Sequence, residues 1–297
     1  MAARSADHSS KLNISAALAS VSVALILVLL KVWALGATQS LSVAASLADS
    51  ALDMMMSLAG LMAVIYAARP ADEDHAFGHT SVEDLTALAQ SLFILISAGV
   101  IAWAAVGRLQ SDAPTPLMAQ GRGIMVMAVS IMLTIALVLW QRRVARRTRS
   151  KVVAADSLHY LSDLLPNLGA IAALWISHQF GIGQVDSIIA LAAAAMLAFG
   201  ATTIGKGAWD ALMDRSADTT LLSGIAAITG GFPGIRGFHD LKTRTAGSRV
   251  FVHLHIELDG DQSLREAHAI GAALRRRIIE TYPQCDVIIH KDVAGET

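Results

Sequence analysis

The stretch Ser46-Leu-Ala-Asp49-Ser-Ala-Leu-Asp53 places two aspartates four residues apart inside a long apolar segment, at about residues 40–68. This segment predicts a helix that crosses the hydrocarbon core of a bilayer, which takes roughly 20 residues. Because residues four apart lie on one helix face, Asp49 and Asp53 are expected to point the same way. An ionisable residue in such a helix costs roughly 2.5–3.5 kcal/mol. The pair therefore indicates a functional site within a membrane.

Five further apolar stretches extend this interpretation along the chain. Of its 297 residues, 54% are hydrophobic and 16% are charged, whereas about a quarter are charged in ordinary soluble chains. The predicted fold is an all-α transmembrane bundle of six helices. The spans are expected at about residues 12–34, 40–68, 85–107, 117–140, 152–177 and 184–208. We interpret the first as a span because it is longer than the core of a signal peptide, about 7–15 residues.

The rest of the chain, from about residue 209, has the pattern of a soluble α+β domain. Residues 249–259 alternate strictly between apolar and polar, which predicts a strand. Ser263 and Glu266 form a capping box that begins a helix, and residues 286–290 predict a short strand. The predicted parts are an N-terminal cytoplasmic tail (1–11), the transmembrane domain (12–208) and a cytoplasmic metal-binding and dimerisation domain (209–297).

Basic residues predict the orientation of the chain, because Lys and Arg accumulate in cytoplasmic loops. The loops after the first and fifth spans carry neither residue. The loop after the fourth span carries Arg142, Arg143, Arg146, Arg147, Arg149 and Lys151. Both termini are therefore expected in the cytoplasm. The net charge of −1 gives no basic field for nucleic acid, although the basic loop is suited to anionic lipid.

A second pair of potential ligands repeats the spacing of the first. His159 and Asp163 lie four residues apart in the expected fifth span. Together with Asp49 and Asp53 they supply one imidazole and three carboxylates, which is the number and type of ligands for tetrahedral zinc. The single cysteine of the chain excludes a cysteine cluster. Asp156 lies on a similar stripe and is either a helix-start residue or a substitute ligand.

Two more groups of residues offer metal ligands outside the spans. The loop Asp72-Glu-Asp-His75-Ala-Phe-Gly-His79 contains two imidazoles, and Gly78 lets its backbone bend. It is interpreted either as a metal site or as a solvated acidic loop. In the C-terminal domain the candidates lie on separate predicted elements: His239, His255, His268, His290 and Asp292. They meet only if sheet and helix pack suitably, and the alternative is a set of ordinary surface histidines.

The motifs that carry these residues resemble the cation diffusion facilitator family, in particular its bacterial zinc and ferrous-iron efflux group. Residues 46–53 and 159–163 resemble the transport site, residues 74–79 the loop site, and residues 238–244, 255–257, 267–268 and 286–292 the cytoplasmic domain. The resemblance implies a metallochaperone-like, ferredoxin-like C-terminal domain and a homodimer. It implies Asp49, Asp53, His159 and Asp163 as transport ligands, Asp72, His75 and His79 as loop ligands, and His239, His255, His268, His290 and Asp292 as a two-metal cluster.

These features predict a secondary transporter, and not an enzyme, that exports a divalent metal from the cytoplasm of a bacterium in exchange for protons by alternating access. It is expected in the inner membrane as a multi-pass protein. Zn²⁺ is the first candidate, both as transported ion and in the C-terminal domain, with Fe²⁺ and Cd²⁺ as alternatives, since one His with three Asp suits each. A membrane-embedded metal channel or a metalloenzyme is the alternative function, although the chain has no His-Glu-x-x-His motif.

Two residues depart from the pattern of the family. Ser81 stands where close zinc-transporting relatives have a Lys, which puts in question a charge interlock across the dimer that involves Asp214. Pro166 lies just after the second ligand pair and predicts a kink in the fifth span, because proline removes a helical hydrogen bond.

Overall fold

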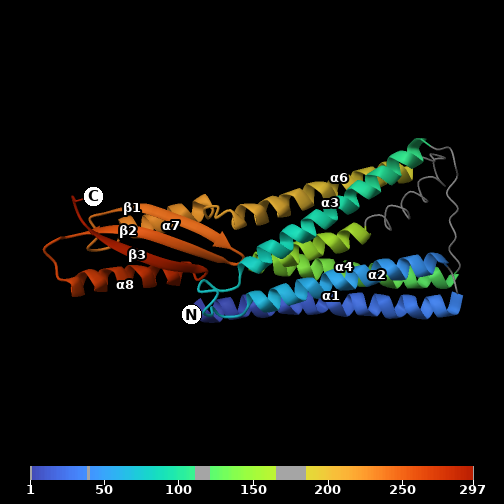
Figure 1. The fold of residues 1–297 in the computed structure, drawn as a ribbon, viewed down its shortest axis with the longest axis horizontal. Helices are drawn as coiled ribbons and strands as arrows, with labels where there is room; N and C mark the ends of the chain where they lie inside the picture. The colour runs from blue at the N-terminus through green and yellow to red at the C-terminus, as the bar shows by residue number, and fades with distance from the viewer. Residues whose placement is uncertain (1, 39–40, 111–120, 165–184, 297) are drawn as a thin grey trace. The chain divides into compact units, whose positions relative to one another are not determined.

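The computed structural model describes residues 2–38, 41–110, 121–164 and 185–296. Its ribbon is drawn in Figure 1. The chain divides into two compact units, of which one is Leu12–Ala208 and the other is Trp209–Thr297 together with Met1–Lys11. Pro166 lies outside the described residues, so the predicted kink stays a prediction.

The first unit is built from long helices. They are α1 (Ala2–Thr38), α2 (Leu41–Ala67), α3 (Ser81–Gln110), α4 (Gly121–Thr148) and α6 (Val185–Leu212), with a further helix at residues 151–164. Within the described ranges, four windows are long and apolar enough to cross a membrane: Ser10–Trp33, Ser50–Ala67, Ser81–Gly107 and Ser187–Leu212. The six-span count is therefore still a prediction, since α4 is not among the four and the fifth predicted span lies partly outside the described residues.

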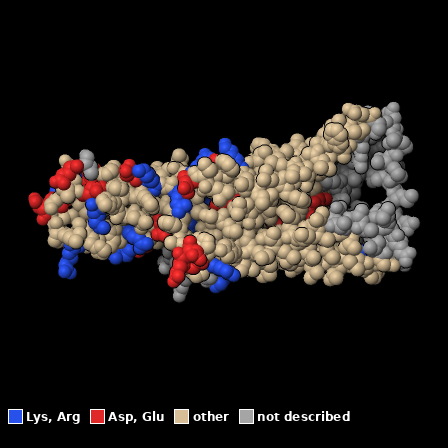
Figure 2. Space-filling view, in the orientation of Figure 1, with Lys and Arg blue, Asp and Glu red and all other residues tan. Residues whose placement is uncertain are grey.

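Small residues allow the helices of this unit to approach closely. Ala87, Ala155 and Ala208 come from three different helices, are fully buried and pack in one cluster. Such small side chains are typical of contacts between membrane helices. Large apolar side chains point outward instead, with Trp103 84% and Phe199 76% exposed. On the face drawn in Figure 2 the long helices present mainly uncharged side chains, as a lipid-facing surface requires.

The second unit is a three-stranded sheet with helices. Its elements are α7 (Thr219–Gly230), β1 (Gly237–Ala246), β2 (Arg249–Leu258), α8 (Leu264–Thr281) and β3 (Cys285–Val293), and the strand order is β1-β2-β3. β1 and β2 are antiparallel, whereas β2 and β3 are parallel. A parallel pair needs a crossover, which α8 provides. The predicted strands correspond to β2 and β3, while β1 was not predicted.

The two faces of β2 have different roles. Val252, Leu254 and Ile256 are fully buried and pack against α8 in the hydrophobic core. His255 and Glu257 alternate with them and are half-buried on the opposite face. The predicted capping box begins α8, since the Ser263 hydroxyl accepts from the Glu266 amide and the Glu266 carboxylate accepts from the Ser263 amide. The core thus leaves one face of the sheet available for polar chemistry.

We expect Leu274→Ala to destabilise the second unit by about 2–5 kcal/mol, because it leaves a cavity between α8 and the sheet. Hydrogen–deuterium exchange of the full-length protein should become faster in β2 and α8. Leu264 lies on the same helix but is 83% exposed, whereas Leu274 is fully buried. Leu264→Ala is therefore the matched control and should exchange like wild type. Equal effects of the two substitutions would contradict this packing.

Candidate metal centres

The first candidate centre lies between α2 and the helix of residues 151–164. Asp53 from α2 meets His159 and Asp163, and one ligand atom of each lies within 4.8 Å of the others. The Nε2 atom of His159 is 3.3 Å from an Asp53 carboxylate oxygen, and His159 is only 3% exposed. The structure thus brings together three of the four residues expected in the spans. The side chain of Asp49, one helical turn before Asp53, lies outside the described residues.

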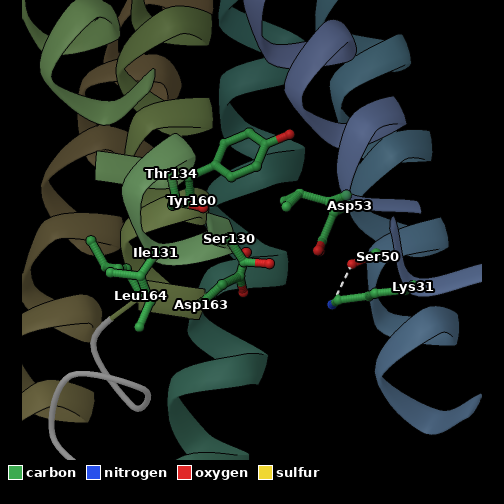
Figure 3. A pocket seen from close by; sticks show the side chains of 10 residues that line it. Lys31, Ser50, Asp53, Ser130, Ile131, Thr134, Tyr160, Asp163 and Leu164 are labelled. Atoms are coloured by element: carbon green, nitrogen blue, oxygen red, sulfur yellow. Dashed lines mark hydrogen bonds between the residues drawn. The ribbon is translucent and has the colours of Figure 1, made fainter. Parts of the chain in front are cut away.

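The two carboxylates border a cavity of about 70 Å³, which is several times the ~10–15 Å³ that one water molecule needs. Figure 3 shows Asp53 and Lys31 on one side of it and Asp163 with Ser130 on the other. Other polar residues that line it are Ser50, Thr134 and Tyr160. Leu27, Ile131 and Leu164 complete the lining, so the two carboxylates border a cavity that is part polar and part apolar.

A buried chain of hydroxyl groups ties three helices together beside this centre. The Tyr160 hydroxyl lies 2.8 Å from the Ser57 hydroxyl, and the Ser20 hydroxyl donates to Ser57 at 2.8 Å. These residues come from the 151–164 helix, from α2 and from α1. Since Tyr160 follows His159 directly, the hydrogen bonds fix the position of His159 relative to Asp53. Such satisfied buried networks rigidify the structure around them.

Asp156 has a partner of its own and does not join the group of Asp53, His159 and Asp163 in the described part of the chain. Its carboxylate accepts a hydrogen bond from the Gln141 amide of α4 at 2.5 Å, and Asp156 is 5% exposed. This contact connects α4 to the helix that carries His159.

The second candidate centre is the loop between α2 and α3, where all three expected residues converge. Asp72 lies 3.1 Å from the Nδ1 atom of His75 through one carboxylate oxygen and 3.1 Å from the Nε2 atom of His79 through the other. Gly78 adopts a positive φ of 84°, which favours glycine. The backbone N–H of His75 donates a hydrogen bond to the Asp72 carboxylate at 2.7 Å. This hydrogen bond is the largest of the effects that lower the pKa of Asp72. Asp72 therefore keeps the charge that a metal ligand needs.

The third candidate centre lies on the polar face of the sheet. The register places His239 opposite His255 and His255 beside His290. Asp292 reaches all three imidazoles, with nitrogen–oxygen distances of 3.5 Å to His239, 2.9 Å to His255 and 3.2 Å to His290. One ligand atom each of His239, His255 and Asp292 lies within 4.8 Å of the others, while His290 contacts the second oxygen of Asp292 from the edge of this group.

His268, the remaining residue predicted for this centre, lies exposed on α8, outside the convergent group among the described residues. Glu257 was not among the predicted ligands, and its carboxylate is 3.2 Å from the Nδ1 atom of His239. Alternation along β2 could have found it, because Glu257 is two residues after His255 and therefore lies on the same face.

Lys31 is a second residue near a candidate centre that was not predicted. It borders the cavity of Asp53 and Asp163, and its ammonium group donates to the Ser50 hydroxyl at 2.6 Å. Its signal in the sequence is simple, since Lys31 is the only charged residue in the first apolar stretch, residues 12–34.

Charged pairs within the chain lie near Ser81 and include Asp214, while the interlock across the dimer stays a prediction. Asp214 accepts a hydrogen bond from the Arg244 guanidinium at 3.1 Å within the second unit. In the first unit, Lys151 donates to Asp84 at 2.7 Å and to the Gly207 carbonyl at 3.0 Å. These pairs form within one copy of the chain.

The first unit combines long apolar helices with a buried group of acidic and imidazole side chains. The α+β unit that follows has a histidine-rich face. Together these features are typical of a membrane protein that handles metal cations. Comparison with known families agrees with this class. Residues 17–213 match the cation efflux transmembrane domain, and residues 217–293 match the cytoplasmic domain of cation efflux proteins. The chain belongs to the cation efflux family, which is the cation diffusion facilitator family.

Individual relatives resemble nearly the whole chain. The cation-efflux pump FieF of Pectobacterium carotovorum is 40% identical over 285 residues, covering 96% of this chain and 94% of the relative. FieF of Klebsiella pneumoniae is 39% identical over 277 residues, covering 93% and 91%. The metal-bound C-terminal domain of the CzcD transporter from Thermotoga maritima covers 27% of this chain and 99% of its own, with 26% identity and a TM-score of 0.26. Because the family's domains and these FieF pumps match nearly the whole chain, it is a multi-pass cation-efflux transporter of the membrane.

We expect Asp72→Ala to remove one bound zinc ion per chain, because Asp72 is the group that faces both imidazoles of the loop. Equilibrium dialysis of the full-length protein with Zn²⁺ measures this. Asp74 is an exposed carboxylate in the same loop and lies outside the convergent group. Asp74→Ala should therefore bind like wild type, and an equal loss in both variants would show that only the overall charge of the loop matters.

Proposed function

We propose that this transporter exports a divalent transition metal, Zn²⁺ first, in exchange for protons. The convergence of Asp53, His159 and Asp163 within 4.8 Å in the helical unit carries the proposal. Zinc takes imidazole nitrogen and carboxylate oxygen as ligands at roughly 2.0–2.2 Å, so a modest movement of these side chains would enclose the ion. Asp49, on the same helix as Asp53, is the proposed fourth ligand. Fe²⁺ and Cd²⁺ are the alternative ions, since a mixed nitrogen and oxygen set also accepts them.

Proton exchange follows from the chemistry of these ligands. A metal ion binds a neutral imidazole and ionised carboxylates, so binding releases protons and protonation releases metal. A more acidic outer side would therefore favour unloading of the ion there. His159 is the proposed main proton carrier, because imidazole changes its charge more readily near neutral pH than a carboxylate does, and the aspartates serve first as ligands.

The proposed arrangement in the membrane has six spans with both termini in the cytoplasm. It is supported by the basic residues at the end of α4, which include Arg146 and Arg147, since such residues remain on the cytoplasmic side. The FieF relatives are bacterial, which supports the inner membrane as the location.

The second unit is the proposed metal sensor and dimer clamp. His239, His255 and Asp292 form a half-buried group, the exposed His290 contacts Asp292 beside it, and His268 on α8 is the further ligand implied by the family. Metal bound by the domains of two chains would draw them together, and occupancy would shift transport through its different affinity for two states. A permanently occupied structural site is the alternative.

We expect Asp53→Ala to abolish zinc uptake driven by a pH gradient in proteoliposomes, because the variant loses a ligand at the centre of the site. A zinc-sensitive dye inside the vesicles measures the flux. Asp261→Ala removes an exposed carboxylate of the second unit and should transport like wild type. Normal flux in the Asp53 variant would refute the proposed site.

The same vesicles distinguish exchange from a channel. An ionophore that collapses the proton gradient should stop uphill zinc accumulation by an antiporter. Zinc flux that ignores the proton gradient would identify a channel instead.

We expect removal of metal by a chelator to lengthen the distance between the two C-terminal domains of a dimer. A nitroxide attached at Arg276→Cys, an exposed position of α8, reports this distance by pulsed electron resonance. Burial raises the pKa of the native Cys285 thiol to about 11, so the label should favour the new cysteine. When Asp292→Ala is added to the labelled protein, the distance should no longer respond to metal. If the distance does not change in the labelled protein that keeps Asp292, a permanently occupied structural site is favoured.

A further inference from the structure

We propose that Lys31 is a built-in counter-cation of the transport cavity, whose fixed positive charge opposes a bound divalent metal and promotes its release. The inference rests on the proposed transport site of Asp53, His159 and Asp163. It concerns a residue outside that ligand set, and it assigns to Lys31 an effect on how tightly the ion is held.

The position of Lys31 supports this role. Lys31 lies within the apolar window Ser10–Trp33 of α1, where an ammonium group is unfavourable unless it is paired or hydrated. Its side chain reaches the cavity of about 70 Å³ that Asp53 and Asp163 also line. Figure 3 shows it extending from α1 toward the space between these two carboxylates. Among the described residues that line the cavity, Lys31 is the one with a positive side chain, and it lies beside the two negative ones.

Ser50 holds the ammonium group in this position. Its hydroxyl accepts from the Lys31 ammonium at 2.6 Å, and Ser50 is 1% exposed on α2, three residues before Asp53. The hydrogen bond joins α1 to the helix that carries the ligand. It keeps the charge near the site without making Lys31 a ligand, since an ammonium group has no lone pair to offer a metal.

The electrostatic consequence follows from the sign of the charges. Lys31 also interacts electrostatically with Asp163, so it stabilises the negative charge of that carboxylate when no metal is bound. A divalent ion that enters the cavity is attracted by the carboxylates and repelled by the ammonium group. Both effects are stronger inside a protein than in water. Lys31 thus lowers the affinity of a site that would otherwise hold its cargo too long for rapid turnover.

The test uses the full-length protein with Lys31→Gln, Lys31→Arg and Ser50→Ala. Zinc affinity is measured by competition titration, in a background with Asp72→Ala and Asp292→Ala that leaves the transport site to be observed. Maximal zinc flux is measured in proteoliposomes. Lys31→Gln should bind zinc at least about tenfold more tightly, which equals about 1.4 kcal/mol, and its maximal flux should fall about tenfold. Lys31→Arg keeps the charge and should retain wild-type values for both.

Ser50→Ala separates charge from structure, because it removes the hydrogen bond and keeps the ammonium group. It should change affinity less than Lys31→Gln does. Wild-type or weaker zinc binding in Lys31→Gln would overturn the inference, and so would equal effects of Lys31→Gln and Ser50→Ala. Asp53→Ala in the same titration tests the site itself. If Asp53→Ala still binds zinc, the proposed transport site is wrong. If Asp53→Ala loses zinc binding while Lys31→Gln binds zinc like wild type, only the role of Lys31 is refuted.

Discussion

The helical unit must accommodate three ionisable side chains in one small region among apolar helices, and its packing depends on this constraint. Each of Asp53, His159 and Asp163 costs roughly 2.5–3.5 kcal/mol in a span when it is isolated. Their approach to within 4.8 Å offsets part of that cost, and a bound cation offsets more. The hydroxyl chain of Ser20, Ser57 and Tyr160 positions the helices so that this approach is maintained. Stability and the proposed cation binding therefore depend on the same few contacts.

In the second unit, hydrophobic packing and polar chemistry are divided between the two faces of one strand. On β2, Leu254 and Ile256 build the core with α8, while His255 and Glu257 face the other side. The polar face therefore gathers imidazoles and carboxylates at little expense to packing. Asp292 supplies a negative charge that is shared by histidines from three strands. In contrast to the helical site, this face is half-open to water, which leaves its side chains accessible to dissolved ions.

Local spacing in the sequence was sufficient to predict the parts of the sites that lie on one helix or one loop. Four-residue spacing placed His159 and Asp163 on one face, and the short loop held Asp72, His75 and His79 close together. Local spacing could not show that His239, His255 and His290 are neighbours, because their proximity depends on the register between strands that are distant in sequence. In addition, the sequence of β1 shows no clear alternation of apolar and polar residues. The cavity contact of Lys31 depends on the packing of α1 against α2 and was missed for the same reason. The six-span count, the position of Asp49 and the effect of Pro166 remain predictions.

The most direct test of the account is a cryo-electron microscopy structure of the full-length protein with Zn²⁺ bound. The account predicts an ion in the helical unit that is coordinated by the His159 imidazole and by the carboxylates of Asp53 and Asp163, at about 2.0–2.2 Å. A zinc-loaded structure in which these three side chains hold no ion, or in which they face lipid, would contradict it.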